Sequence, residues 1–235
     1  MSASLVVEGL TYELRRSQKR TTIGITVDRD GSLILTAPHD CPTQTIEQTA
    51  RKKGLWVHTK LAEKRFLFRP KPPKEYVTGE NFYHLGRSHR LLLVDVPEDH
   101  TATPPALRLR RGRFELRRDE RHRADEHFVA WYVRNGQPWI QRRVDLLADR
   151  IRVSPASVNV RELGYRWGSC GLKGNLNFHW RTVCLPPRMV EYVVVHELVH
   201  VIEPHHGRDF WKRVERVLPD YTSRKRWLAE NGHRF

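Results

Sequence analysis

One short stretch constrains the fold of this chain more than any other: residues 193–211, VVVHELVHVIEPHHGRDFW. An α-helix advances about 100° per residue, so residues four apart lie about 40° apart on one face. His196 and His200 can therefore direct their imidazole nitrogens at a single metal ion. Glu197 lies close enough to act on a water there without binding the ion itself. In this H-E-x-x-H arrangement the two histidines bind zinc and the glutamate is the general base.

The residues around the motif predict that its helix is largely buried. Burying two imidazoles and a carboxylate without a strong partner would destabilise the fold. The apolar flanks therefore favour a metal site over a chance pair of surface histidines. These flanks are Val193, Val194, Val195, Val199, Val201 and Ile202.

A catalytic zinc has three protein ligands, and four residues could supply the third: Glu203, His205, His206 and Glu215. Pro204 disfavours helical geometry at Glu203, and we expect it to end the helix. Gly207 is expected to give the chain turning freedom right after His206. This geometry favours the histidine pair over the acids but does not separate His205 from His206.

The charge balance of the 235-residue chain indicates a polyanionic partner. Lys and Arg number 42 against 27 Asp and Glu, a formal net charge of +15. Such an excess attracts nucleic acid before other partners, and the alternative is an arginine-rich surface that is merely solvated. Three scattered cysteines exclude a disulfide framework, and the absence of 18 consecutive apolar residues excludes an ordinary membrane span. With no signal-peptide pattern at the N-terminus, we expect a cytoplasmic protein.

The N-terminal segment is predicted to be β-rich with one helix. Apolar positions alternate over residues 23–27 and follow again over 33–35, and Asp30-Gly31 between them is a strong hairpin signal. Helical spacing then runs from Thr43 to about Phe66.

The prolines of RPKPPK (69–74) predict an extended connector, after which a second β-rich run begins. We expect hairpins over residues 84–94 and 107–118. In the second of these, strand alternation would place several arginines on one face, either as a phosphate-contacting patch or as the solvated outer face of a sheet. The arginines concerned are Arg108, Arg110, Arg111, Arg113, Arg117 and Arg118.

The C-terminal half is predicted to be mainly helical. A helix is expected over residues 121–151, kinked or split at Pro138. An extended piece and a loop leading into a strand follow, before Pro186-Pro187 starts the helix with the two histidines. A last helix is expected over residues 223–230, and no internal repeat is visible.

Four motifs in this half form a set: RWGSC (166–170), GNLNFHW (174–180), Pro186-Pro187 and YVVVHELVHVIEPHHGRDFW (192–211). The set resembles the YgjP-like family of zinc metallopeptidases, which is related to the SprT-like and WLM zincins. The resemblance spans most of the chain and is specific from about residue 158 to 227.

The resemblance implies particular roles for the residues of the long motif. It assigns zinc to His196, His200 and His206, with Glu197 as the catalytic base. The five residues between His200 and His206 match the spacing of the related WLM proteins, which leaves His205 as a neighbour. The resemblance does not identify an oxyanion-stabilising residue, for which Arg166, Tyr192 and His205 are candidates. Cys170 is interpreted as a buried thiol, with an inhibitory zinc ligand as the alternative.

The resemblance also implies how a substrate would bind. An extended peptide would pair as a strand against residues 174–180, with Asn175 and Asn177 as substrate-binding residues. This chain departs from the family pattern at one position, because His179 stands before Trp180 where other members usually carry Asn.

We therefore predict an α+β protein with a β-rich N-terminal region over residues 1–120. A zincin-like metallopeptidase domain with an HExxH active-site helix would follow over residues 121–235. The leading hypothesis is a zinc-dependent endopeptidase acting on proteins or peptides. The charge, together with analogy to the SprT-like and WLM relatives, extends it to proteins associated with DNA. The alternatives are a nucleic-acid-binding protein with a non-catalytic zinc site and a metal-dependent hydrolase of non-peptide substrates.

Overall fold

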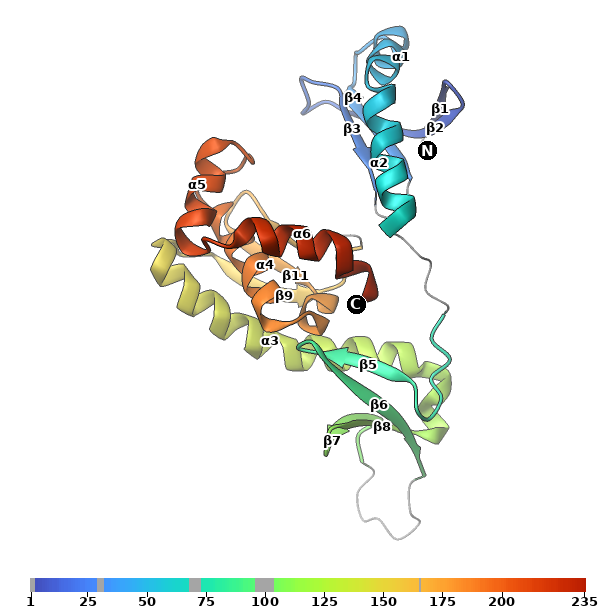
Figure 1. Cartoon of the computed structure of the whole chain (residues 1–235), viewed down its shortest axis with the longest axis vertical. Coiled ribbons are helices and arrows are strands. Elements are labelled where there is room, and N and C mark those ends of the chain that lie inside the picture. The colour runs from blue at the N-terminus through green and yellow to red at the C-terminus, as the bar shows by residue number, and fades with distance from the viewer. Residues whose placement is uncertain (1–2, 29–31, 68–72, 96–103, 165) are drawn as a thin grey trace. The chain divides into compact units, whose positions relative to one another are not determined.

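The computed structural model describes residues 3–28, 32–67, 73–95, 104–164 and 166–235 (Figure 1). The chain forms two compact units, Met1–Lys71 and Pro72–Phe235. In both units runs of strands are followed by helices, so the protein is a mixed α+β protein, as the sequence predicts. Within the described ranges no helix is both long and apolar enough to cross a membrane.

The first unit contains a four-stranded sheet whose buried face is covered by helices. Its core includes Tyr12, Leu35 and Ile46, which are almost fully buried. The strands lie in the order β1-β2-β4-β3: β1 (Ala3–Val7), β2 (Leu10–Ser17), β4 (Leu33–Pro38) and β3 (Gly24–Val27). The hairpin predicted over residues 23–35 is confirmed, because β3 and β4 pair antiparallel. Asp30-Gly31 itself lies outside the described residues.

The single helix predicted for the N-terminal region is wrong, because the structure has two. They are α1 (Thr43–Lys52) and α2 (Gly54–Leu67). Lys53 leaves helical geometry between them, with φ −96° and ψ 2°. Gly54, a poor helix former, begins the second helix. Residues 69–72 of the predicted connector lie outside the described residues.

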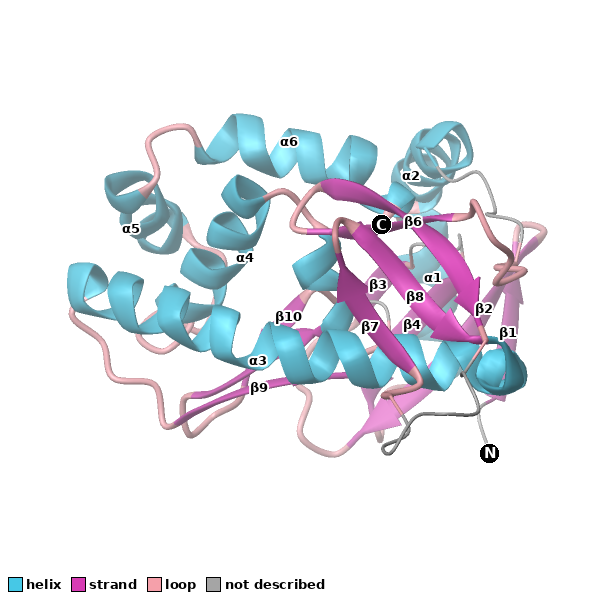
Figure 2. Cartoon of the chain, turned by 90° about the horizontal axis from the view of Figure 1, so that it is seen from below, coloured by secondary structure: helices cyan, strands magenta, loops and turns pink. Residues whose placement is uncertain are grey.

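The second unit begins with another four-stranded sheet (Figure 2). Both predicted hairpins are confirmed, and each turns through two residues with positive φ, Leu85-Gly86 and Arg111-Gly112. These are the dihedrals of type I′ turns, which match the twist of the flanking strands. The order is β5-β6-β8-β7: β5 (Asn81–His84), β6 (Arg87–Val94), β8 (Arg113–Arg117) and β7 (Leu107–Arg110).

The two sheets share one topology, although the sequence shows no repeat. In each, the first two strands form an antiparallel hairpin (β1-β2 and β5-β6). The second strand then pairs parallel with the fourth (β2 with β4, and β6 with β8). The third strand then pairs antiparallel with that last strand. The pairing directions and the strand order are thus the same in the two sheets, while their side chains differ.

A 28-residue helix, α3 (Ala124–Ile151), is the centre of the second unit. One side packs on the sheet β5–β8 and the other on β9 and α4, so α3 lies between two layers (Figure 1). Pro138 does not split it. The Gln137 side chain reaches sideways instead and bonds the backbone of Val158 and Val160 in β9, at 2.8 and 2.7 Å.

A small three-stranded sheet and three helices complete the second unit. The sequence predicts the last helix, which is confirmed, but not α5. The sheet has the order β10-β11-β9, with β10 (Gly168–Cys170), β11 (Asn175–His179) and β9 (Ser157–Arg161). The helices are α4 (Pro187–Val199), α5 (Arg208–Val217) and α6 (Tyr221–Asn231), and short 3-10 helices cover Arg118–Arg123, Trp180–Cys184 and Gly232–Arg234.

The division between the compact units falls after Lys71, whereas the sequence places a boundary after residue 120. The sheet β5–β8 buries its apolar face on α3, where the rings of Phe82 and Phe128 stack with centroids 4.0 Å apart. Both rings belong to one continuous core that extends to Val194 of α4. Because one face of a sheet must be covered by another element, residues 73–120 belong structurally with the C-terminal region.

Candidate metal centre

The helix α4 presents the H-E-x-x-H motif from a buried position. Pro187 occupies its first turn, where a missing N–H is tolerated. The valines at 193–195 and 199 are at most 3% exposed, which confirms the predicted burial of the helix, whereas Val201 is half-buried and Ile202 is 41% exposed, so the prediction is wrong for Ile202. Beyond Val199 the chain continues in a helical turn, and the last such bond runs from Glu203 N–H to the Val199 carbonyl. Pro204 follows, so the helical bonding stops where the sequence predicts.

Three histidine nitrogens converge at the end of this helix. The Nε2 atom of His206 lies 2.9 Å from Nε2 of His196 and 3.1 Å from Nε2 of His200. All three donor atoms fall within 4.8 Å of one another. Two ligand nitrogens of a tetrahedral zinc ion lie about 3.3 Å apart, given Zn–N bonds of about 2.05 Å. The spacing of the three imidazoles therefore fits zinc.

The loop 200–207 carries His206 back to the helix by a tight turn. Gly207 N–H donates to the His205 carbonyl at 2.7 Å, a bond across two residues that places His206 at the apex of a γ-turn. Gly207 itself has φ −76° and ψ −174°, extended backbone that any residue adopts. The predicted need for glycine freedom at this position is wrong. His205 is exposed beside the site, and it is not one of the three converging histidines.

Each imidazole is held so that Nε2 points into the cluster. His200 Nδ1 lies 3.0 Å from the Glu203 carbonyl oxygen, to which it donates. Nε2 therefore carries the free lone pair that can bind a metal. His196 Nδ1 is buried without a hydrogen-bond partner among the described residues, so packing must hold its ring. Phe210 supplies this packing, because its fully buried ring lies 4.6–5.0 Å from the centroids of all three imidazoles.

The surroundings keep the histidines neutral, as metal ligands must be. Burial lowers the pKa of His196 to about 3, and the charges of His200, His206 and Lys225 act in the same direction. Burial also lowers the pKa of His206. The pKa of His200 is lowered by burial, although its bond to the Glu203 carbonyl opposes this.

Glu197 lies beside the cluster and is 6% exposed. Burial raises the pKa of its carboxyl to about 8, and the positive charge of Arg166 partly opposes the rise. Gly168 of β10 lies directly against it, since a Cβ at that position would stand 2.7 Å from both Cγ and Oε1 of Glu197. Only glycine lets the strand approach the carboxylate so closely. The sequence contains this glycine in RWGSC but does not reveal its role, and the same is true of Phe210.

The strand that borders the site is β10, not β11. The central strand β11 pairs with β10 on one edge and β9 on the other, so peptide pairing against residues 174–180 is wrong. Within the described chain β10 pairs on one edge only. Hydrogen bonds from β11 reach the Trp167 carbonyl, and Gly171 N–H returns one to Asn175. By antiparallel alternation the backbone groups of Gly168 and Cys170 point to the free edge.

The structure does not bring Asn175 and Asn177 to the cluster. Paired residues on neighbouring strands share a face, and Gly168 pairs with Phe178 on the face toward Glu197. Asn175 and Asn177 alternate with that set and lie on the opposite face. There Asn175 Oδ1 accepts a bond from the Ser157 hydroxyl at 3.0 Å.

His179, the departure from the family pattern, is buried and holds the chain around the site in place. Its Nε2 lies 2.7 Å from Glu162 Oε1, and its Nδ1 accepts from the Arg181 N–H at 3.0 Å. Trp180 Nε1 donates to the other Glu162 oxygen at 2.7 Å. These bonds tie the start of the 162–167 segment, which leads to Arg166 and β10, to the end of β11.

Two further groups near Glu197 keep their protons. Burial raises the pKa of the Tyr192 hydroxyl to about 12, so it remains a hydrogen-bond donor, and its ring lies 6.0 Å from that of His196. Burial and the charge of Glu197 raise the pKa of the Cys170 thiol. Sulfur binds metals as the thiolate, and Cys170 is not part of the converging set.

A helix-borne histidine pair, a third histidine returned by a loop and a buried glutamate are typical of metal-dependent hydrolases. The particular family follows from the sequence as a whole. The model of the YgjP-like metallopeptidase domain matches residues 21–231, and the chain belongs to this family. None of the curated proteins matches this chain. A solved structure, the metallopeptidase zymogen of Pyrococcus abyssi abylysin, is 21% identical over 38% of this chain and 91% of its own, with a TM-score of 0.35.

Proposed function

We propose that this chain is a zinc-dependent endopeptidase whose ligands are His196, His200 and His206 and whose general base is Glu197. The observation that supports it best is the convergence of three neutral Nε2 atoms beside a carboxyl with a raised pKa. Three histidines leave a coordination position open, as in catalytic zinc sites, whereas structural sites have four protein ligands.

Zinc bound to these imidazoles would supply a Lewis acid that acidifies a water and polarises the scissile carbonyl. Glu197 takes the proton of that water and delivers it to the nitrogen of the leaving amine. Because this carboxyl is buried, it can keep the proton out of bulk water between the two transfers. Tyr192, protonated and adjacent to His196, is the residue we propose to donate to the developing oxyanion.

The free edge of β10 is the proposed place for the peptide. Outward-facing backbone groups at Gly168 and Cys170 can extend the sheet by one strand, with main-chain bonds that do not depend on the side chains of the substrate. Such an edge suits extended segments of protein substrates. Because the net charge is +15, we include proteins associated with DNA among these substrates.

Metal content and cleavage of casein or a peptide library test this proposal together. We expect about one zinc per chain, a large loss of zinc in His206→Ala, and unchanged zinc in the exposed neighbour His205→Ala. Glu197→Gln should keep its zinc and lose cleavage by a factor of at least about 100. Full zinc occupancy in His206→Ala would remove His206 as a ligand, and unchanged cleavage in Glu197→Gln would remove the base.

A further inference from the structure

The register of the sheet β5–β8 lines up three arginines across neighbouring strands. Arg90 of β6 pairs with Arg113 of β8, and Arg113 pairs with Arg110 of β7. Residues paired in this way share a face, so the three side chains form one row, which we call the arginine row. All three are exposed. Among the described residues no acid forms an ion pair with any of them.

Three other arginines close to the row are paired with acids, whereas Arg87 and Arg111, like the row, form no ion pair among the described residues. One step along the strands, Arg108 Nε bonds Glu115 Oε2 at 2.7 Å. Arg117 bonds Asp119, and Arg118 bonds Asp95 at 2.7 Å. Of the six arginines of residues 107–118, three are thus held by acids. Of the patch predicted from the sequence, only Arg110 and Arg113 belong to the row, and its third member, Arg90, comes from β6.

The first unit shows that the topology does not require the arginine row. Its sheet has the same strand order and pairing directions. Glu13 is the equivalent of Arg90, because each lies four residues after the glycine of the first hairpin turn in its sheet, Gly9 or Gly86. Glu13 pairs with Ile34, and Ile34 pairs with Thr26. The corresponding row there contains no arginine. Like charges opposite one another destabilise a sheet, so the arginine row is unfavourable without an anion to offset it.

The row is long enough to contact more than one phosphate of a nucleic-acid backbone. Neighbouring strands lie about 4.8 Å apart, so the row spans about 10 Å, and each strand of duplex DNA advances about 3.4 Å per phosphate. Because arginine side chains are long, the three guanidinium groups can reach successive phosphates, which they bind through paired N–H donors. An anionic membrane fits less well, because the exposed large apolar side chains of the described residues all lie on other elements.

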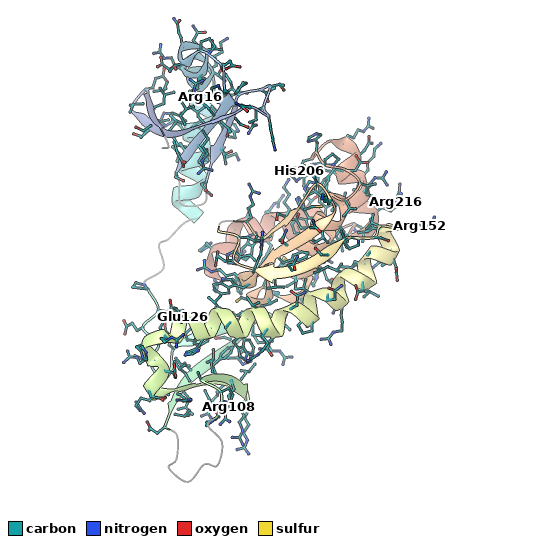
Figure 3. All side chains as sticks on the ribbon, turned by 180° about the vertical axis from the view of Figure 1, so that it is seen from behind. Arg16, Arg108, Glu126, Arg152, His206 and Arg216 are labelled. Carbon is teal, nitrogen blue, oxygen red and sulfur yellow. The ribbon has the colours of Figure 1, made fainter. Side chains whose placement is uncertain are left out.

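We infer that the arginine row, Arg90, Arg110 and Arg113, binds the phosphate backbone of duplex DNA. The sheet lies on the opposite side of α3 from the metal centre, as the positions of Arg108 and His206 in Figure 3 show. DNA on the row would leave the metal centre open to a protein. The binding itself does not depend on the proposed peptidase function, whereas its use to hold the enzyme near DNA-associated substrates does.

Salt-dependent binding of a 20-base-pair duplex to the full-length protein, followed by fluorescence anisotropy, tests the inference. Each phosphate contact contributes about 0.9 to the slope of log K against log salt. The variant Arg90→Gln/Arg110→Gln/Arg113→Gln should lose about 2.7 from that slope, equal to about 40-fold less change in affinity between 50 and 200 mM salt. The charge-matched control is Arg142→Gln/Arg150→Gln/Arg216→Gln, from exposed positions on α3 and α5 that form no ion pair within the described part of the chain. It should change the slope by less than about 1.

Three outcomes would overturn the inference: no binding of the wild type at 50 mM salt, equal losses in the two triple variants, or tighter binding of anionic vesicles or an RNA duplex than of the DNA. Zinc content and peptide cleavage are measured on the same samples. They should be unchanged in the row variant, which shows that it is folded. Loss of DNA binding and loss of hydrolysis are thus separate results.

Discussion

Replacing Gly168 by alanine tests whether β10 positions Glu197, the proposed general base. The added Cβ would stand 2.7 Å from Cγ and Oε1 of Glu197, whereas ordinary contact begins near 3.4 Å. The carboxylate or the strand must therefore move by about 0.7 Å, and Glu197 is buried, with little room to yield. Gly168 has no positive φ, so backbone strain does not contribute and the effect isolates the contact.

The expected loss follows from this displacement. A misplacement of about 1 Å costs roughly 100-fold in rate, so we expect kcat for peptide cleavage to fall about 10- to 100-fold with unchanged zinc content. Overpacking should also lower the free energy of unfolding by about 1–3 kcal/mol. Urea denaturation measures this loss without any assay of activity.

The control for this substitution lies in the same hairpin. A Cβ at Gly171 would meet nothing closer than 3.6 Å, so Gly171→Ala should keep both kcat and stability close to the wild type. Gly168→Ala with wild-type kcat and wild-type stability would refute the close approach of β10 to Glu197. Equal losses in the two variants would instead point to a general weakening of the hairpin.

Two further predictions concern the buried groups of the site. In metal-free protein the raised pKa of Glu197 means that the native state holds a proton that the unfolded state releases between pH 4.5 and 8, so stability falls as pH rises through this window. The free energy of unfolding of metal-free Glu197→Gln should therefore be higher than that of the metal-free wild type by on the order of 3 kcal/mol at pH 7. This difference in the free energy of unfolding, measured by urea denaturation, should disappear near pH 4.5. A difference that does not change with pH would contradict the prediction. Phe210→Ala should weaken zinc binding about 10- to 100-fold, because the ring supports all three imidazoles. Ile140→Ala, an equally buried change on α3, should lower stability by about 2–5 kcal/mol with zinc affinity unchanged in a chelator competition.

The local features of this protein could be predicted because each depends on residues close together in the chain. The spacing of His196, Glu197 and His200 fixes their side of a helix once helical geometry is given. Two-residue turns ending in Gly86 and Gly112 follow from local dihedral preference. The return of His206 also takes place within ten residues of His196, although the resemblance rather than the geometry selects it over His205.

Other features depend on contacts between distant segments and could not be predicted in this way. The prediction that Asn175 and Asn177 bind substrate requires β11 to border the site. The pairing of β11 with both neighbours excludes it from the edge, and strand parity turns both side chains away. The boundary after Lys71 depends on which helix covers the sheet β5–β8. No local pattern encodes that choice.

By itself, then, the sequence determined the helix with the H-E-x-x-H motif, the hairpins and the positive charge of this protein, because periodicity, turn preference and composition are properties of short segments. The tertiary structure alone decided that Gly168 meets Glu197, that Phe210 lies beneath three imidazoles, and that Arg90 joins Arg110 and Arg113 in one row. Each of these depends on strand register or helix packing. Register and packing are set by the burial of apolar surface across the whole unit, which brings together residues that the chain keeps apart.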